Sequence, residues 1–304
     1  MDQTQRPEAP TRRIRVIVNP ASGGNRRDRN AIDRVREGLG DGAEVLPWTP
    51  GRPLTWKGGE KPDIVVAAGG DGTVSALAAE LIGSGTPLAV LPLGTFNYFA
   101  RGLGYSEDPE TAARQILDGE AHAIRVGTVN GTPFLNNASL GLYPHVLRER
   151  ERTYDRWGRH RLAAHWSVVR SFVRFRQPLS ITLDRGEGPE TRESALVFVA
   201  RSAYQLERFG IEGGEAISDD AFAVLIARAT TRGALARVIA RLTARRAREG
   251  RDYDMLSADD MTITLHRRDR ALLAHDGEKR VEHSPFRFRM DPRPLTVILP
   301  GEAT

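Results

Sequence analysis

The sequence lacks cysteine altogether and has little lysine: Lys57, Lys61 and Lys279 are the only lysines among 44 basic residues. Without cysteine there is neither a disulfide framework nor a thiolate metal site, and the redox compartment stays open. No apolar run approaches the roughly 20 residues that a membrane-spanning helix needs. The polar start, Met1 to Pro10, lacks the apolar centre of a secretory signal. We therefore expect a disordered leader at residues 1–11 and a cytoplasmic location.

Arginine is what the chain has in excess. The net charge is +5 and the sequence pI is about 9.8. A basic surface favours anionic partners such as phospholipid head groups, nucleotides or nucleic acid, and charge alone does not choose among them. The 304 residues, 40% hydrophobic and 27% charged, suit a globular protein with room for two domains.

The first half of the chain alternates strand and helix patterns. Ile14 to Val18, Ile64 to Ala68 and Leu88 to Leu91 are short apolar runs typical of strands. After the second run, apolar residues from Val74 to Leu81 recur at i, i+3, i+4 and i+7, which predicts a helix that begins near Thr73. This alternation predicts an α/β domain whose parallel sheet is covered on both faces.

From about residue 128 the candidate strands crowd together, which is typical of an antiparallel, sandwich-like domain. Two helical insertions are expected, near residues 158–176 and 232–249. We expect the α/β domain over 12–128, the β-rich domain over 129–292, and a C-terminal strand and tail over 293–304, whose return to the first domain is left open. The expected strands are Pro133 to Ala138, Leu179 to Leu183, Ala195 to Ala200, Ala221 to Ala227, Met261 to Leu265, Ala271 to Ala274, Phe286 to Met290 and Leu295 to Leu299.

A glycine-rich turn, Gly69-Gly70-Asp71-Gly72-Thr73, joins a predicted strand to the predicted helix. Glycines let the backbone approach a ligand closely, and the N–H groups of a helix start favour an anion. Asp71 would repel a phosphate unless Mg²⁺ bridged the two. Thr73 could cap the helix and donate its hydroxyl to a phosphate oxygen. The alternative is a plain connection in which Asp71 or Thr73 only caps the helix.

Two further turns weaken that alternative: Asn19-Pro20-Ala21-Ser22-Gly23-Gly24 and Pro92-Leu93-Gly94-Thr95-Phe96-Asn97. In a parallel sheet, all three turns lie at the carboxyl ends of strands, where open α/β sheets bind ligands. The chain has no G-x-x-x-x-G-K-[ST], no G-x-G-x-x-G after a strand and no protein-kinase motif set. These three kinds of nucleotide site are therefore excluded.

In their order, these turns resemble the diacylglycerol kinase catalytic domain family, which includes sphingosine kinases and bacterial soluble lipid kinases. Similar GGDGT turns occur in NAD kinases and phosphofructokinase-like enzymes, and the Pro-Leu-Gly-Thr-x-Asn block points to lipid kinases instead. The resemblance is carried by Val18-Asn19-Pro20, Ser22-Gly23-Gly24, Val66 to Ser75, Leu91 to Arg101, Asp276-Gly277-Glu278 and Leu295 to Pro300.

This resemblance implies an NAD kinase- and phosphofructokinase-like nucleotide domain and a β-rich, sandwich-like domain, with a lipid-admitting cleft between them. It implies transfer of the ATP γ-phosphoryl group, with Mg²⁺, to a hydroxyl of a diacylglycerol-like or sphingoid-like lipid. The ATP-binding residues implied by motif match are Asn19, Ser22, Gly23, Gly24, Thr49 (a loose match), Gly69, Gly70, Asp71, Gly72, Thr73, Gly94, Thr95 and Asn97.

Three acidic residues outside those turns receive roles from the resemblance. Glu278 matches the family's catalytic acid, and together with Asp71 it forms the expected catalytic pair; a carboxylate near the lipid hydroxyl can accept its proton. The alternative for Glu278 is an exposed acid in an Asp-Gly hairpin. Asp276 is either a ligand of the catalytic Mg²⁺ or the turn former. Asp220 is the nearest match to a structural Mg²⁺ site of the bacterial relatives, although the glycine that accompanies it there is lost.

Departures from the family pattern keep a second function open. Relatives usually carry an acid where this chain has Tyr98, and the Ala200-Arg201-Ser202 stretch lacks an asparagine often found there. The alternative is a catalytically weak or inactive protein that binds nucleotide or lipid at a membrane. A kinase for a soluble substrate such as NAD is a third hypothesis.

The arginines suggest how the chain meets a lipid. Around residues 231–249, one face is apolar, and Arg237, Arg241, Arg245 and Arg248 make another. Such a helix either lies on an anionic bilayer surface or packs on its domain with the arginines in solvent. The segment 148–176 interleaves arginines with aromatic residues, a combination that suits a membrane interface or nucleic acid, although an aromatic stripe on a helix is more often part of a core. We expect a lipid substrate at an anionic membrane surface, no nucleic acid and no transmembrane segment; homo-oligomerisation and the identity of the lipid stay open.

Overall fold

The computed structural model describes residues 12–19, 35–36, 38–40, 42–56, 60–142, 144 and 177–301. The chain divides into two compact units. Unit 1 comprises Met1–Ile124 and Arg293–Thr304, and unit 2 comprises Arg125–Pro292. Two stretches of chain that are far apart in the sequence therefore build unit 1.

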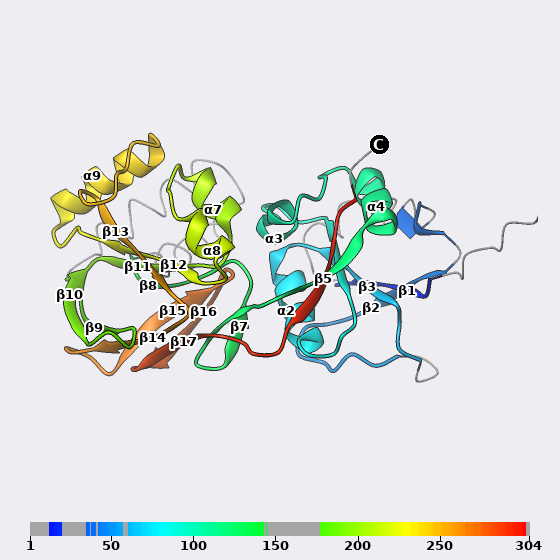
Figure 1. Ribbon diagram of the computed structural model, residues 1–304, viewed down its shortest axis with the longest axis horizontal. Coiled ribbons are helices and arrows are strands. Elements are labelled where there is room, and N and C mark those ends of the chain that lie inside the picture. The colour runs from blue at the N-terminus through cyan, green and yellow to red at the C-terminus, as the bar shows by residue number, and fades with distance from the viewer. Residues whose placement is uncertain are drawn as a thin grey trace, which may run out of the picture. The chain divides into compact units, whose positions relative to one another are not determined.

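A six-stranded sheet forms the centre of unit 1 (Figure 1). Its strand order is β2-β1-β3-β4-β18-β5, and every neighbouring pair is parallel except β18–β5. This confirms the predicted parallel sheet. The strands are β1 (Ile14–Val18), β2 (Ala43–Pro47), β3 (Ile64–Gly69), β4 (Leu88–Pro92), β5 (Glu120–Ile124) and β18 (Leu295–Leu299).

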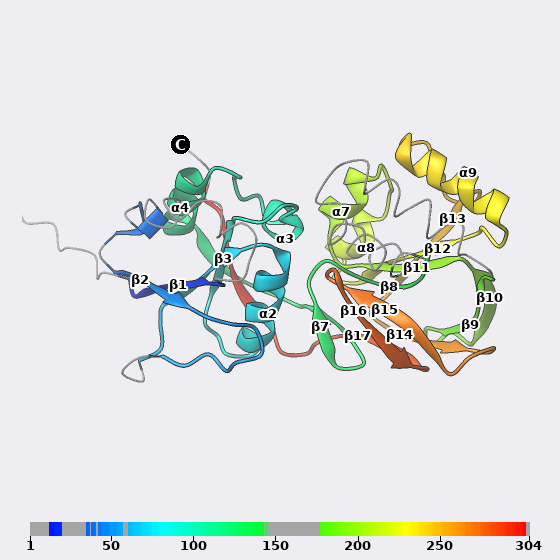
Figure 2. The same ribbon diagram turned by 180° about the vertical axis from the view of Figure 1, so that it is seen from behind.

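Helices α2 (Asp71–Leu81), α3 (Tyr98–Gly102) and α4 (Pro109–Asp118) belong to unit 1 (Figure 2). Every residue of β3 is buried, as expected for a strand covered on both faces. Helix α2 buries the predicted apolar stripe from Val74 to Leu81. It begins at Asp71 with Gly70 as its N-cap, so Thr73 lies inside the first turn and the prediction that Thr73 caps the helix is wrong.

Unit 2 is a sandwich of two six-stranded antiparallel sheets, with the orders β10-β9-β14-β17-β6-β7 and β13-β12-β11-β8-β15-β16. Apolar residues from both sheets, among them Phe134, Phe222 and Phe288, form one buried cluster. This confirms the β-rich, sandwich-like second domain. The strands are β6 (Gly127–Val129), β7 (Thr132–Phe134), β8 (Asn137–Gly141), β9 (Leu179–Asp184), β10 (Glu190–Ser194), β11 (Leu196–Ala200), β12 (Phe222–Ala227), β13 (Tyr253–Ala258), β14 (Asp260–Leu265), β15 (Arg270–His275), β16 (Glu278–His283) and β17 (Phe286–Met290).

Helices cover the outer face of the second sheet. Leu206 from α7 (Ala203–Arg208) and Ile217 from α8 (Gly214–Ser218) pack with Ala223 and Leu225 of β12. Leu235 of α9 (Arg232–Thr243) anchors a neighbouring cluster. With the other sheet on one side and helices on the other, all six residues of β12 are buried. The expected helical insertion at 158–176 lies outside the described residues.

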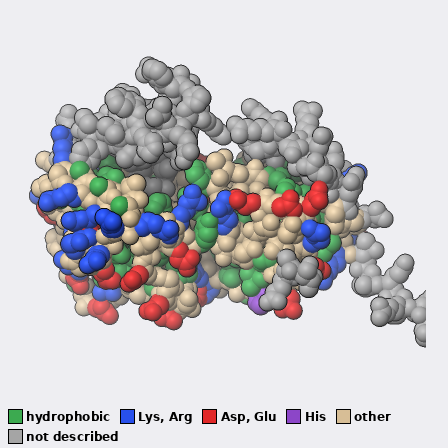
Figure 3. All heavy atoms as spheres, turned by 90° about the horizontal axis from the view of Figure 1, so that it is seen from above, with side chains coloured by type: hydrophobic (Ala, Val, Ile, Leu, Met, Phe, Trp, Pro, Cys, Tyr) green, Lys and Arg blue, Asp and Glu red, His purple; other side chains and the backbone are tan. Residues whose placement is uncertain are grey.

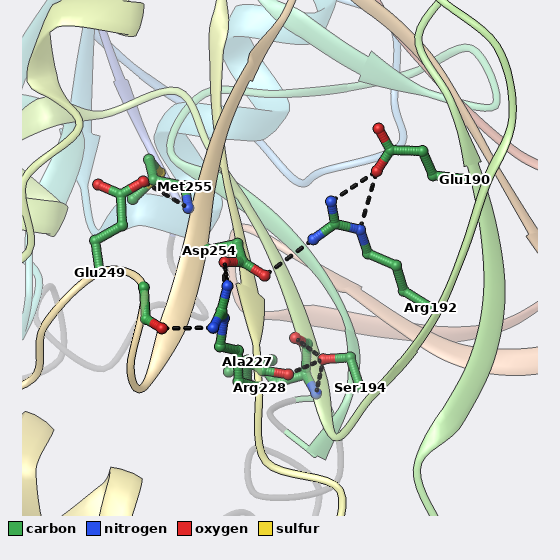
Figure 4. Close-up of polar contacts among 10 residues, drawn as sticks. Glu190, Arg192, Ser194, Ala227, Arg228, Glu249, Asp254 and Met255 are labelled. Atoms are coloured by element: carbon green, nitrogen blue, oxygen red, sulfur yellow. Dashed lines mark hydrogen bonds and ion pairs between the residues drawn. The ribbon is translucent and has the colours of Figure 1, made fainter.

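A chain of ion pairs joins one edge of the two sheets (Figure 4). Arg192 of β10 contacts Glu190 at 2.6 Å and Asp254 of β13 at 2.9 Å, and Arg228 contacts the same Asp254 at 2.7 Å. Since β10 and β13 are each the edge strand of a different sheet, these contacts connect the sheets where the backbone cannot.

Candidate functional site

The strands of unit 1 bring the predicted turns to one edge of its sheet. Val18 pairs with Pro47 and Ala68, and Gly69 pairs with Pro92, so β1 to β4 end side by side. The residues that follow these ends are Asn19, Thr49, Gly70 to Thr73, and Gly94 to Asn97. Ser22, Gly23 and Gly24, which were expected to line the triphosphate, lie outside the described residues.

The second and third turns touch backbone to backbone. A Cβ placed on Gly94 would lie 2.4 Å from Gly70 Cα, and one on Gly70 would lie 3.2 Å from Gly94 Cα. Real Cβ atoms do not approach another heavy atom as closely as the first of these distances. The contact therefore requires glycine at position 94, and it makes the two turns one continuous surface.

Asn97 shapes the third turn from inside. It adopts φ 51°, in the left-handed region, and is 4% exposed. Its side-chain amide donates to Pro92 O and Gly94 O, and its Oδ1 accepts from Gly94 N at 2.9 Å. Asparagine tolerates this backbone conformation better than most residues. A direct contact of Asn97 with ATP stays a prediction, because the amide is occupied in holding its own turn.

The carboxylate of Asp71 links the second and third turns. It is the first residue of α2, where the helix dipole favours a negative charge, and its Oδ1 accepts from Phe99 N in α3 at 3.2 Å. A Cβ on Gly72 would meet no atom of the described residues within 4 Å, so the turn is open at that point. Thr73 is 4% exposed and packs beneath Gly69, which gives its side chain a packing role.

Tyr98 follows directly on the third turn, at the position where the resemblance implied an acid. Its ring stacks on that of Phe96, with centroids 5.5 Å apart and planes 4° apart. The chain thus places an aromatic pair beside the glycine turns in place of a second carboxylate.

The donor set bears on which metal the site fits. Among the described residues, no group of three or more His, Cys, Asp or Glu side chains could hold a metal ion. Mg²⁺ usually keeps several waters and binds through one or two carboxylates together with phosphate oxygens. Asp71 beside an open, glycine-lined turn fits a Mg²⁺ shared with a bound phosphate, and the described residues do not form an all-protein cage.

Asp276 forms the β15–β16 hairpin of unit 2. Asp276 and Gly277 have φ values of 44° and 90°, the positive values that a two-residue type I′ turn needs. The Asp276 carboxylate accepts the backbone N–H groups of Leu135, Asn136 and Asn137 at 2.7, 2.8 and 3.2 Å. These bonds anchor the hairpin to the start of β8, and they favour the turn former over the predicted metal ligand.

Glu278 is the first residue of β16, exposed and paired with His275 across the hairpin. Burial, and then the nearby Arg280, lower the pKa of His275 below its usual value, against the opposite effect of Asp276 and Glu278. His275 is therefore neutral at neutral pH and adds no positive charge beside Glu278. Both readings of Glu278, an exposed hairpin acid and a general base, fit this placement.

Asp220 argues against the predicted structural Mg²⁺. Its Oδ2 contacts Arg125 Nη1 at 3.0 Å, and its Oδ1 contacts Arg201 Nη2 at 2.5 Å. Arg201 also donates to the backbone carbonyls of Arg125 and Ile217. Two guanidinium groups thus neutralise the carboxylate on which a cation would depend. Sequence reasoning noticed Arg201 only as a departure from the family pattern and missed Arg125.

Comparison with known proteins agrees with the resemblance found in the sequence. Residues 13–129 match the family model of the Diacylglycerol kinase catalytic domain. The chain is 37% identical over 142 residues to "Probable lipid kinase YegS-like" of Pseudomonas aeruginosa (strain UCBPP-PA14), covering 42% of this chain and 44% of that protein. It is 42% identical over 96 residues to "Diacylglycerol kinase" of Bacillus subtilis (strain 168), covering 31% and 30%. The chain thus spans less than half the length of these relatives.

A solved structure extends the similarity to both units. The structure described as that of a diacylglycerol kinase from Bacillus anthracis str. Sterne matches with a TM-score of 0.63, covering 95% of this chain and 97% of that one. At 17% identity this likeness shows the fold alone. The family match over residues 13–129 and the named relatives confirm the resemblance that the glycine turns predicted.

Proposed function

We propose that this protein is a lipid kinase that transfers the γ-phosphoryl group of ATP to a hydroxyl of a lipid. The observation that carries the proposal is the contact between Gly70 and Gly94 beside Asp71, within the segment that matches the kinase family model. A helix start next to glycine backbone is suited to hold phosphate groups.

The turns of unit 1 bind the nucleotide in this proposal. Asp71 holds Mg²⁺ together with phosphate oxygens, and the metal, when bound, neutralises charge on the phosphates. Asn97 and Thr73 act mainly by shaping the turns. The full set of proposed nucleotide contacts is Asn19, Ser22, Gly23, Gly24, Thr49, Gly69 to Thr73, Gly94, Thr95 and Asn97.

Glu278 supplies the proton acceptor. A lipid hydroxyl is a poor nucleophile, and it loses its proton as its oxygen bonds to the transferred phosphorus. The carboxylate of Glu278 takes that proton, and the departing ADP carries away the electron pair of the broken P–O bond. Asp276 positions Glu278 through the three backbone bonds that hold the hairpin.

The test is transfer of labelled γ-phosphate from ATP to a panel of lipids in mixed micelles. Asp71→Asn keeps an oxygen that can accept from Phe99 N but removes the charge, and Glu278→Gln removes the base. We expect each variant to lose at least about 100-fold in rate. Glu187→Gln, at an exposed acid of another hairpin, is the matched control and should leave the rate unchanged. Absence of labelled lipid at every Mg²⁺ concentration would contradict the proposal.

The proposed partner is an anionic membrane surface, and the proposed contact with it is made by α9. Leu235 and Val238 are buried, so the helix packs on unit 2; Arg232 and Arg237 are exposed, while Arg241 is paired with the buried Asp252. No acidic residue occurs between residues 231 and 248, and basic side chains gather on the face that carries α9 (Figure 3). Co-sedimentation with phosphatidylglycerol vesicles at low salt, and its absence with neutral vesicles, is the expected result.

No helix among the described residues is long and apolar enough to cross a membrane.

A second candidate function, a nucleotide- and lipid-binding protein with little turnover, is favoured by the Phe96–Tyr98 stack. The same assay separates the two functions. Thermal stabilisation by ATP, and vesicle binding, without labelled lipid would support the binding protein.

A further inference from the structure

Strand β16 forms an open edge of the second sheet of unit 2. It is the last strand in the order β13-β12-β11-β8-β15-β16 and lies beside β15 (Figure 1). Ser284 N donates to Asp269 O at 2.8 Å, so the even-numbered residues of β16 turn their backbone groups towards β15. The N–H and C=O groups of Val281 and His283 therefore point outwards. No other described residue bonds to these outward groups.

The opposite edge of the same sheet is closed by the chain itself. In β13, the outward backbone groups include the carbonyls of Tyr253 and Ser257. Gly250 N donates to Tyr253 O at 2.9 Å. Arg185 Nη1 donates to Ser257 O at 3.2 Å. A turn and a side chain thus use the outward groups of β13, whereas those of Val281 in β16 stay open.

The centre of the open edge is apolar. Among the large hydrophobic side chains of the described residues, only Val281 and Phe209 are exposed, at 60% and 41%. Val281 pairs across the hairpin with Leu272, which is partly buried, so two apolar side chains lie side by side at the edge. A further strand on the open side would cover Val281 and bond its backbone.

The charges of β16 match those of a second β16 in one register. Charged side chains on an edge strand normally discourage pairing. In an antiparallel pair centred on Val281, however, Arg280 of each copy lies opposite Glu282 of the other, and the outward groups of Val281 bond those of its copy. A shift of two residues places Glu282 opposite Glu278 or opposite itself, which is repulsive. A shift of one residue turns the core-facing side of one copy to the outer side of the other.

From the open backbone groups, the apolar centre and the charge pattern, we infer that the chain forms a dimer in which two β16 strands pair antiparallel about Val281. The partner is a second copy of this chain, and the two sheets become one continuous sheet. One pair of strands buries less area than the roughly 1,600 Å² of a standard stable interface, so we expect a micromolar, concentration-dependent dimer.

Sedimentation of the full chain between about 1 and 200 µM tests the inference, and a dimer at the upper end is the expected result. Val281→Lys places two cations at the symmetry axis and should weaken the dimer at least about tenfold. Phe209→Lys, at the other exposed hydrophobic side chain, is the control and should leave the dimer unchanged. A monomer at every concentration, or equal weakening by the two variants, overturns the inference.

Reversal of charge tests the register. Arg280→Glu sets two carboxylates against each other across the interface and should weaken the dimer about tenfold. Arg280→Glu combined with Glu282→Arg restores the match between the copies as well as the ion pair within each chain. The double variant should dimerise within about threefold of the wild type. A double variant as weak as Arg280→Glu overturns the inference.

Cross-linking gives an independent measure of proximity, because the chain has no cysteine of its own. A short bismaleimide should join Val281→Cys to its own copy. Phe209→Cys should stay monomeric under the same conditions. Equal cross-linking of the two variants would reflect random collision and overturns the inference.

Discussion

At the scale of single residues, the candidate site depends on two glycines, which have no β-carbon. Gly70 and Gly94 belong to different turns, yet their backbones meet because neither has a β-carbon. The hydrogen bond from Phe99 N to Asp71 then joins the same two turns from the other side. The position of Asp71 is thus set by the packing of glycines as well as by α2.

Gly94→Ala should disrupt this arrangement. Its Cβ would lie 2.4 Å from Gly70 Cα and 2.6 Å from Asn97 Oδ1, so one of the two turns must move. Overpacking of this kind costs about 1–3 kcal/mol of unfolding free energy. We expect that loss in urea denaturation, together with loss of the thermal stabilisation that ATP gives.

Gly72→Ala is the control, because its Cβ would meet none of the described residues within 4 Å. In a first helical turn, alanine is at least as favourable as glycine, so we expect no loss of stability. If both alanine variants are equally stable, the backbone contact between the turns does not exist in solution.

The glycine turns could be found from the sequence, because spacing and residue type are local properties. Asp276 could not be placed in the same way. Its Asp-Gly pair predicts a hairpin, but the three N–H groups that its carboxylate accepts lie about 140 positions earlier in the chain.

At the scale of elements, the strands that the sequence missed are mostly edge strands. β5, β10, β13 and β16 were not expected, and each lies at the edge of its sheet. An edge strand needs fewer apolar residues, and charges there discourage pairing with chains whose charges do not match. β10 (ETRES) and β16 (EKRVEH) are accordingly polar sequences. β12, which is buried on both faces, is a continuous apolar run and was recognised.

Asp252 ties α9 to the sheet below it, and this contact should respond to pH. Burial opposes the charge of Asp252, but hydrogen bonds from Arg251, Arg241 and the Arg248 N–H outweigh it and lower its pKa to about 2. The usual value is 3.8. Because the folded state holds the proton less tightly than the unfolded state, the stabilisation is complete above pH 4 and is lost as the pH falls towards 2.

We expect this residue to account for about 2 kcal/mol of the loss of unfolding free energy between pH 4 and pH 2. Urea denaturation at several pH values measures it. Asp252→Asn should be less stable at pH 7 and should lack this part of the pH dependence. Glu187→Gln, which alters an exposed acid, should keep the full dependence. Parallel curves for the wild type and Asp252→Asn would show that the arginines do not hold Asp252 charged.

At the scale of the whole molecule, the chain leaves unit 1 after β5 and returns to it with β18, which lies between β4 and β5. The C-terminal strand was predicted from its apolar residues, but its neighbours were not. Val297 pairs with Leu88 and Leu295 pairs with Ile124, and pairing over such separations leaves no local pattern. The two units therefore cannot be separated by a single cut in the sequence.

Arg125, Arg201 and Asp220 determine whether the stability of the whole chain depends on a bound metal ion. Both oxygens of Asp220 are bound by guanidinium groups, and the Arg201 side chain is only 11% exposed. No divalent cation is needed to neutralise this carboxylate. We expect thermal unfolding of the full chain to show the same Tm with EDTA as with Mg²⁺.

Arg201→Met tests the cause, because it keeps an apolar stem and removes the charge. Since Asp220 is 41% exposed, water screens the broken pair, and we expect a loss of about 2 kcal/mol, below the range for fully buried pairs. Arg267→Met, at an arginine that is 59% exposed and paired with Glu193, should change stability by less than about 0.5 kcal/mol. A fall in the Tm of the wild type with EDTA would show that a bound cation, and not the arginine pair, holds this part of unit 2.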